Sequence, residues 1–275
     1  MVTSVAKPKT TKRRKRAPGW VPDQHGAWAM LTVPLLLGIT LGGFAWVHLP
    51  LTVTWFIGYF AFFAAGLWLK SRRKAKYVAP MRAYVLAMLP TAALTIILCP
   101  HLVVWAGAFL PLMSVSLWCS HRRKDRSLLN DAVTVAAACL MLPVAYHARV
   151  LTADTLDSAP SWAAVWVLTG IVFLYFFGTV FYVKTIIRER GSRSYLIASL
   201  LYHAVATTIP LTLYYGIAQW QHATTFIGAV ALTVFFALLT VRAWIVPRTS
   251  ATPKQVGLGE LAVSILLVTI TLFVL

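Results

Sequence analysis

The sequence predicts an all-α, polytopic membrane helical bundle of nine transmembrane helices, with a cytoplasmic N-terminus and the C-terminus outside. Two observations predict it: nine apolar segments follow one another, and 24 of the 25 Lys and Arg residues lie in alternate gaps between them. Composition agrees, because 59% hydrophobic and 12% charged residues, with a mean hydropathy of +0.75, leave too little polar surface for a water-soluble domain.

Most of the apolar segments approach the roughly 17–25 residues that a helix needs to cross a hydrocarbon core. Lipid offers the backbone no hydrogen-bond partner, so helices are the expected spanning structure, and the alternating segments of about ten residues that form β-barrels are not seen. The predicted helices cover residues 27–46, 51–69, 83–98, 102–119, 132–146, 162–183, 195–215, 224–246 and 256–275.

The gaps between these segments differ sharply in charge. Basic residues fill the N-terminal tail and residues 70–82, 122–126, 184–193 and 242–254. The alternate gaps hold Arg149 with Asp154 and Asp157. Because loops rich in Lys and Arg stay in the cytoplasm, the five basic gaps are predicted to lie inside.

Two regions are expected. Residues 1–20 are basic and interrupted by Pro and Gly, which predicts a disordered cytoplasmic tail, and residues 21–275 form the nine-helix transmembrane domain. The net charge of +18 is explained by the loop bias and by attraction to anionic headgroups. We therefore expect the lipid bilayer as partner and no nucleic acid.

Cysteine usage indicates neither a metal site nor a disulfide framework. Cys99, Cys119 and Cys139 lie in or beside apolar segments and show no CxxC or Cys/His ligand spacing. They are expected to face lipid or to pack, and no metal and no cofactor are predicted.

The entrance to the first apolar segment groups an acid, an amide and an imidazole: Asp23, Gln24 and His25. Asp23 is suited to cap the first helical turn. His25 is a candidate acid/base because imidazole titrates near neutral pH. These three are the candidate catalytic residues, although a single histidine at the membrane interface is more often solvated or hydrogen-bonded than catalytic.

A second set predicts binding of an anion or a lipid headgroup. Lys184 and Arg188 are four residues apart and share a helix face, where their charges suit a phosphate or carboxylate. The set also includes Arg82, Tyr182 and Glu189. The alternative is an ordinary helix end whose basic side chains extend toward the headgroups.

Four further polar residues lie within or at the edge of predicted spans. Asn130 and Asp131 fall in the first turn of a helix that begins near Ser127, where the helix dipole stabilises the carboxylate. Tyr202 and His203 lie in the seventh apolar segment, with His203 about eight residues inside it. Intramembrane ionisable groups are commonly functional, which makes His203 a site candidate.

Three stretches carry a resemblance to a known family: Pro22 with Gln24–Trp28, Gly178–Lys184 continuing to Arg190, and Pro253–Gly257 with Glu260. In these the chain resembles the YwiC-like family of bacterial integral membrane proteins. The resemblance implies a multi-pass protein of the bacterial inner (plasma) membrane, and it groups the three polar stretches on the cytoplasmic side.

The predicted architecture is also similar to that of UbiA-type prenyltransferases, which hold a prenyl diphosphate through Mg²⁺ bound by Asp-rich loops. Here residues 69–84 contain no Asp or Glu, and the sixth-to-seventh loop has only Glu189, so the carboxylates that divalent cations prefer are missing. Basic residues would instead neutralise a phosphate directly.

Three classes of function remain open. The first is binding or processing of a phosphorylated lipid, such as a phosphorylated isoprenoid, or of another anion, in the cytoplasmic half of the bilayer. The second is transport of a small anion or metabolite, although no inverted repeat is seen. The third is an accessory role in which the protein assembles with a membrane-complex partner. Whether it is an enzyme stays open.

Overall fold

The computed structural model describes residues 19–22, 26–150, 160–217 and 224–274, which form α-helices and short 3-10 segments with no β-strand. The predicted all-α class is therefore confirmed for this part of the chain. Most of the predicted basic tail, residues 1–18, lies outside it.

The helices are α1 (Ala27–Gly42), α2 (His48–Lys70), α3 (Val78–Leu98), α4 (Ala106–His121), α5 (Leu128–Cys139), α6 (Met141–Val150), α7 (Trp162–Ile187), α8 (Arg193–Gly216), α10 (Phe226–Ile245) and α11 (Pro253–Val274). The 3-10 segments are η1 (Ala75–Tyr77), η2 (Pro100–Trp105) and η3 (Val246–Arg248).

Eight helices in the described ranges are long and apolar enough to cross a membrane, by length and composition, with α5 and α6 together counted as one. Helix α1 is apolar but shorter, with 16 residues. It stops before the predicted end at Trp46 because Gly42 and Gly43 follow one another and Gly43 takes a φ of +82°, which ends the helix. Conversely, α6 continues past the predicted end at Tyr146 to Val150.

Hydroxyl side chains start four of the helices. Ser127, Ser161, Ser192 and Thr225 precede α5, α7, α8 and α10, and each side-chain oxygen accepts a hydrogen bond from the backbone N–H three residues later. Such caps satisfy one of the free N–H groups of a first helical turn.

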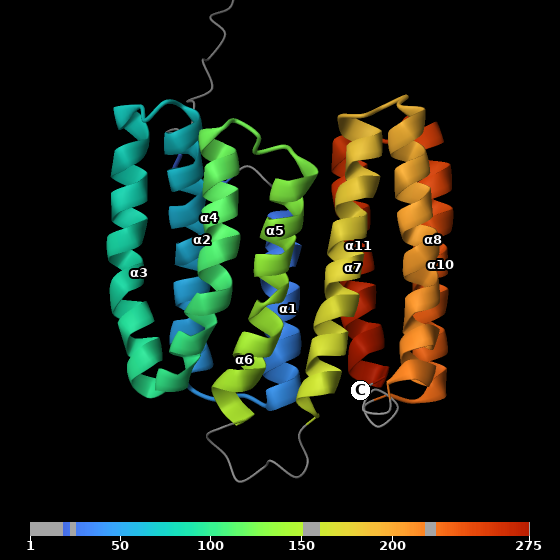
Figure 1. Ribbon diagram of the computed structural model, residues 1–275, viewed down its shortest axis with the longest axis horizontal. Coiled ribbons are helices and arrows are strands. Elements are labelled where there is room, and N and C mark those ends of the chain that lie inside the picture. Colours follow the sequence, from blue (N-terminus) through green and yellow to red (C-terminus); the bar gives the residue numbers. More distant parts are fainter. Residues whose placement is uncertain (1–18, 23–25, 151–159, 218–223, 275) are drawn as a thin grey trace, which may run out of the picture.

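The helices run up and down in one row of packed groups (Figure 1). Helices α2, α3 and α4 lie on one side, α1, α5 and α6 in the middle, and α7, α8, α10 and α11 on the other side. The α2–α3, α4–α5 and α7–α8 connections lie at the same end, where α11 also begins. This end, which carries Lys70, Arg122, Arg188, Arg248 and Lys254, is called the basic end below.

Helix α7 is the most deeply buried of the candidate spans in the described chain. Its Leu168, Ile171 and Phe176 belong to a core that reaches from α1 to α11. The outer surface is apolar as well: Ile97, Leu201 and Ile227 are 63–79% exposed. An apolar exterior of this extent fits a lipid surrounding.

The cysteines were expected either to face lipid or to pack inside the bundle. The second alternative is correct, because Cys99, Cys119 and Cys139 are all buried.

Helices α1 and α6 pack with almost no side chain between them. Gly38 and Gly42 of α1 are four residues apart and face the α6 backbone. A methyl group added at Gly38 would lie 2.2 Å from the carbonyl oxygen of Leu142, and one at Gly42 would lie 3.0 Å from that of Tyr146. Small residues at this spacing let membrane helices approach closely, so the α1–α6 contact depends on them.

We therefore expect Gly38→Ala to lower the stability of the protein by about 1–3 kcal/mol, because the new methyl group can be accommodated only if the two backbones move apart. Gly170→Ala in α7 is the matched control, since no atom lies within 4 Å of a methyl group placed there. Thermal unfolding in detergent measures the difference. Equal melting temperatures for the two variants would contradict the close α1–α6 contact.

Candidate functional site

The main polar cluster inside the bundle is centred on an ion pair between Arg242 of α10 and Glu260 of α11. Arg242 Nη1 donates a hydrogen bond of 2.5 Å to Glu260 Oε1. Both side chains are largely buried, with 16% and 11% of their surface exposed. An ion pair with so little access to water must be closely matched to be stable, because burial of each charge costs free energy.

Helix α7 supplies the other contacts of this pair. Thr179 Oγ1 donates to the second carboxylate oxygen, Glu260 Oε2, at 2.9 Å. The guanidinium carbon of Arg242 lies 4.0 Å from the centre of the Tyr182 ring, in a cation–π arrangement. One turn deeper, the Tyr175 hydroxyl lies 2.8 Å from Ser264 Oγ on α11. Arg242 is thus held on one face by an aromatic ring and at one nitrogen by a carboxylate.

The remaining edge of Arg242 is open. Its Nε and Nη2 atoms are buried and have no hydrogen-bond partner in the described part of the chain. These two nitrogens form the edge of a guanidinium that binds two oxygens of a carboxylate or phosphate side by side. Leaving buried donors unpaired is costly, and no acceptor for this edge lies among the described residues.

A pocket of about 660 Å³ lies next to Arg242, among residues of the α10–α11 connection. Its lining combines Arg242 and Tyr182 with polar residues of the α10–α11 connection and with valines of α11. The other lining residues are Val246, Thr249, Ser250, Ala251, Thr252, Gln255, Val256, Gly259 and Val263. A charged group in the lining of a pocket with mixed polar and apolar walls is a feature of small-ligand sites.

His203 of α8 lies close to the same cluster. It is 1% exposed, and its Nδ1 lies 2.7 Å from the carbonyl oxygen of Ser199. Arg242 is near enough to interact with the imidazole electrostatically. Tyr202, its neighbour, has a structural environment: its hydroxyl donates to the carbonyl oxygen of Leu174 at 3.0 Å, and its ring stacks on Phe181.

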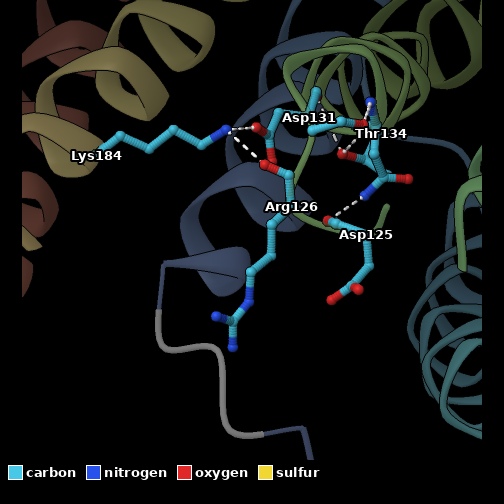
Figure 2. Close-up of polar contacts among 7 residues, drawn as sticks. Asp125, Arg126, Asp131, Thr134 and Lys184 are labelled. Carbon is cyan, nitrogen blue, oxygen red and sulfur yellow. Dashed lines mark hydrogen bonds and ion pairs between the residues drawn. The ribbon is translucent and has the colours of Figure 1, made fainter. Parts of the chain in front are cut away.

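Lys184, predicted to bind an anion, has partners inside the chain. Figure 2 shows its Nζ donating to Asp131 Oδ2 and, at 3.0 Å, to the carbonyl oxygen of Arg126. The Lys184 side chain is 7% exposed. This ion pair connects α7 to the start of α5, so the structure assigns Lys184 a bridging role within the bundle.

Asn130 supports the same connection. Its Nδ2 donates to the carbonyl oxygen of Asp125 at 2.8 Å, and its Oδ1 accepts from Ser116 Oγ of α4 at 2.6 Å. Asp125 in turn pairs with Lys70 of α2 at 2.6 Å. Asn130 and Asp131 therefore hold α2, α4, α5 and α7 together at the basic end.

The other predicted anion ligands lie apart from each other. Arg82 is exposed on α3, which packs on α2 at the far side of the bundle from α7 (Figure 1). Arg188 is exposed and Glu189 half-buried just after α7. The predicted clamp of Arg82, Lys184 and Arg188 is thus not assembled, whereas Tyr182 belongs to the pocket. Asp23, Gln24 and His25 lie outside the described residues.

A smaller polar group lies at the opposite end of the bundle. Cys99 Sγ is 3.1 Å from His101 Nε2, and the Trp105 indole donates to His147 Nδ1 at 2.9 Å. Burial raises the pKa of the Cys99 thiol, which keeps it protonated. Within the described ranges no group of three or more His, Cys, Asp or Glu residues is placed to hold a metal ion.

Sequence reasoning singled out Tyr182 and His203 but not Arg242. Arg242 was counted only among the basic residues of a loop, because its neighbours are apolar and nothing nearby in sequence marks its partner. Glu260 was the available signal, since it is the one acidic residue of the last apolar segment.

The chain is similar in sequence to members of one protein family. The family model described as "YwiC-like protein" matches residues 21–146. The chain is 36% identical over 186 residues to a Bacillus subtilis protein, "Uncharacterized protein YwiC", with 66% of this chain and 73% of that protein covered. It is 27% identical over 244 residues to an uncharacterized protein of Haemophilus influenzae, with 89% and 93% covered. No solved structure matches. The chain is a multi-pass membrane protein and belongs to the YwiC-like family.

Proposed function

We propose that this protein binds an anionic group, either the phosphate of a lipid headgroup or a small oxyanion, at Arg242 on the cytoplasmic side of the bacterial inner membrane. The open Nε and Nη2 edge of Arg242 is the observation that supports this most strongly. Arg242 also lines a pocket of about 660 Å³, together with residues of the α10–α11 connection at the basic end.

The surroundings of Arg242 favour binding over a purely structural role. Tyr182 and Glu260 fix the plane and one end of the guanidinium, so little conformational freedom would be lost when an anion binds. Ser250 also lines the pocket, and its hydroxyl is suited to donate to a further oxygen, whereas Thr249 and Thr252 already donate to the Val246 carbonyl oxygen and to Gln255 Oε1. Val256 and Val263 on the same wall suit an apolar chain, as a phosphorylated lipid would carry.

The proposal includes nine spans, with the basic end in the cytoplasm and α11 ending outside. The clustering of the basic connections at one end supports this orientation. Helix α1, with 16 residues, would complete the set as a short span.

Alkaline phosphatase, which is active only outside the cytoplasm, checks the orientation. Fused to the C-terminus it is expected to be active, and inserted after Thr249, in the α10–α11 connection, it is expected to be inactive. The reverse pattern of activities would contradict the proposed topology.

For the ligand, we expect Arg242→Lys to weaken binding about 10- to 100-fold, the effect of losing a charge-assisted hydrogen bond worth about 1.5–3 kcal/mol. Lysine retains a positive charge beside Glu260 but lacks the two-pronged edge. Native mass spectrometry of the detergent-solubilised protein, with added phosphatidic acid or inorganic phosphate, measures binding and separates the lipid from the free anion.

Arg248→Lys is the matched control, because Arg248 is an exposed arginine of the same end that lies over Trp244. It is expected to bind like the wild type. Binding that survives Arg242→Lys unchanged, or falls equally in both variants, would argue for a general basic surface and against the Arg242 site. Melting temperatures of both variants verify that they are folded.

A further inference from the structure

The imidazole of His203 carries a lone pair that no described residue uses. Its Nδ1 faces the Ser199 carbonyl oxygen at 2.7 Å, and because a carbonyl only accepts, Nδ1 bears the proton of the neutral ring. Nε2 is then an acceptor. It is buried and has no hydrogen-bond partner within the described ranges. A buried acceptor without a donor is a place where a proton can be bound.

The groups around His203 come from α7, α8 and α10, and α11 is connected to them through Arg242. Gly178 of α7 makes room for the ring, since a methyl group there would lie 3.2 Å from Nε2. Arg242 of α10 acts on the imidazole electrostatically, and Glu260 of α11 is bound to Arg242. The tyrosines nearby are Tyr202 beside it on α8 and Tyr182 of α7, whose ring lies against Arg242.

Charge balance links this histidine to the anion site. With neutral His203, the positive Arg242 and negative Glu260 cancel. An anion bound to the open edge of Arg242 would leave a net negative charge among apolar helices, which is unfavourable in a medium of low polarity. A proton on His203 Nε2 would offset that charge without changing any other group.

We propose that His203 takes up a proton when Arg242 binds an anion, so that the two enter the bundle together. The inference rests on the proposed anion site and adds a coupling to it. By linkage, the anion favours the protonated imidazole, and the protonated imidazole favours the anion to the same extent. Joint binding of a proton and an anion is the step that a proton-coupled anion carrier requires.

Sulfate is a suitable probe, because it does not itself titrate near neutral pH. With full-length protein in lipid nanodiscs, sulfate affinity measured by titration calorimetry is expected to rise about tenfold as the pH falls from about 8 to about 6, a coupling of ordinary size. In His203→Gln, the affinity should stay at the wild-type value of the higher pH. His101→Gln, a histidine change at the opposite end of the bundle, should keep the full pH dependence.

Glu260 is the competing proton acceptor, and Glu260→Gln separates the two. If pH dependence persists in Glu260→Gln and is lost in His203→Gln, the coupling lies at His203. If the pH dependence of sulfate binding is lost only in Glu260→Gln, or if the wild type shows none, the coupling is overturned. The anion site stands in either case, provided that Arg242→Lys still weakens sulfate binding. If no sulfate binding depends on Arg242 at any pH, the anion site and the coupling both fail.

Discussion

The requirement that each buried charge find a partner on another helix is the constraint on which the arrangement of α7 and its neighbours depends. Helix α7 lies deepest in the bundle and cannot send polar side chains to water along most of its length. Its Lys184 therefore pairs with Asp131 in the first turn of α5. Its Thr179 and Tyr182 contact the Arg242–Glu260 pair. These contacts orient α5, α10 and α11 around α7.

The two ion pairs differ in whether all their hydrogen-bond donors find partners among the described residues. Lys184 donates to Asp131 and to a carbonyl oxygen, and Asp131 also lies in a capped first turn, so that pair is well satisfied within the chain. Arg242 uses one nitrogen for Glu260 and keeps two buried donors free among the described residues. We therefore propose ligand binding at Arg242 and a structural connection at Lys184, although both are basic residues near one end.

Much of the fold could be predicted from the sequence, since hydropathy and basic loops depend on local composition. Two observed helix ends differ from the predicted ones. Helix α1 ends early at Gly42 and Gly43, and α6 continues past its predicted end through the polar residues His147 and Arg149. The site was harder to predict. His203 stood out as a polar group in an apolar segment, but Asp131 is 53 residues from Lys184 in sequence, and only the packed structure shows that they pair. The open edge of Arg242 likewise depends on tertiary contacts from α7 and α11.

The most direct test of the account observes the Arg242 side chain itself. In arginine-labelled ¹⁵N protein held in nanodiscs, the Nε–H resonance of Arg242 is identified by its absence in Arg242→Lys. Addition of sulfate or phosphatidic acid should shift this resonance in a saturable way, because the Nε–H acquires an oxygen acceptor, while the Arg248 signal stays in place. A resonance of Arg242 that does not move at saturating ligand would contradict the claim that its open edge is a binding site.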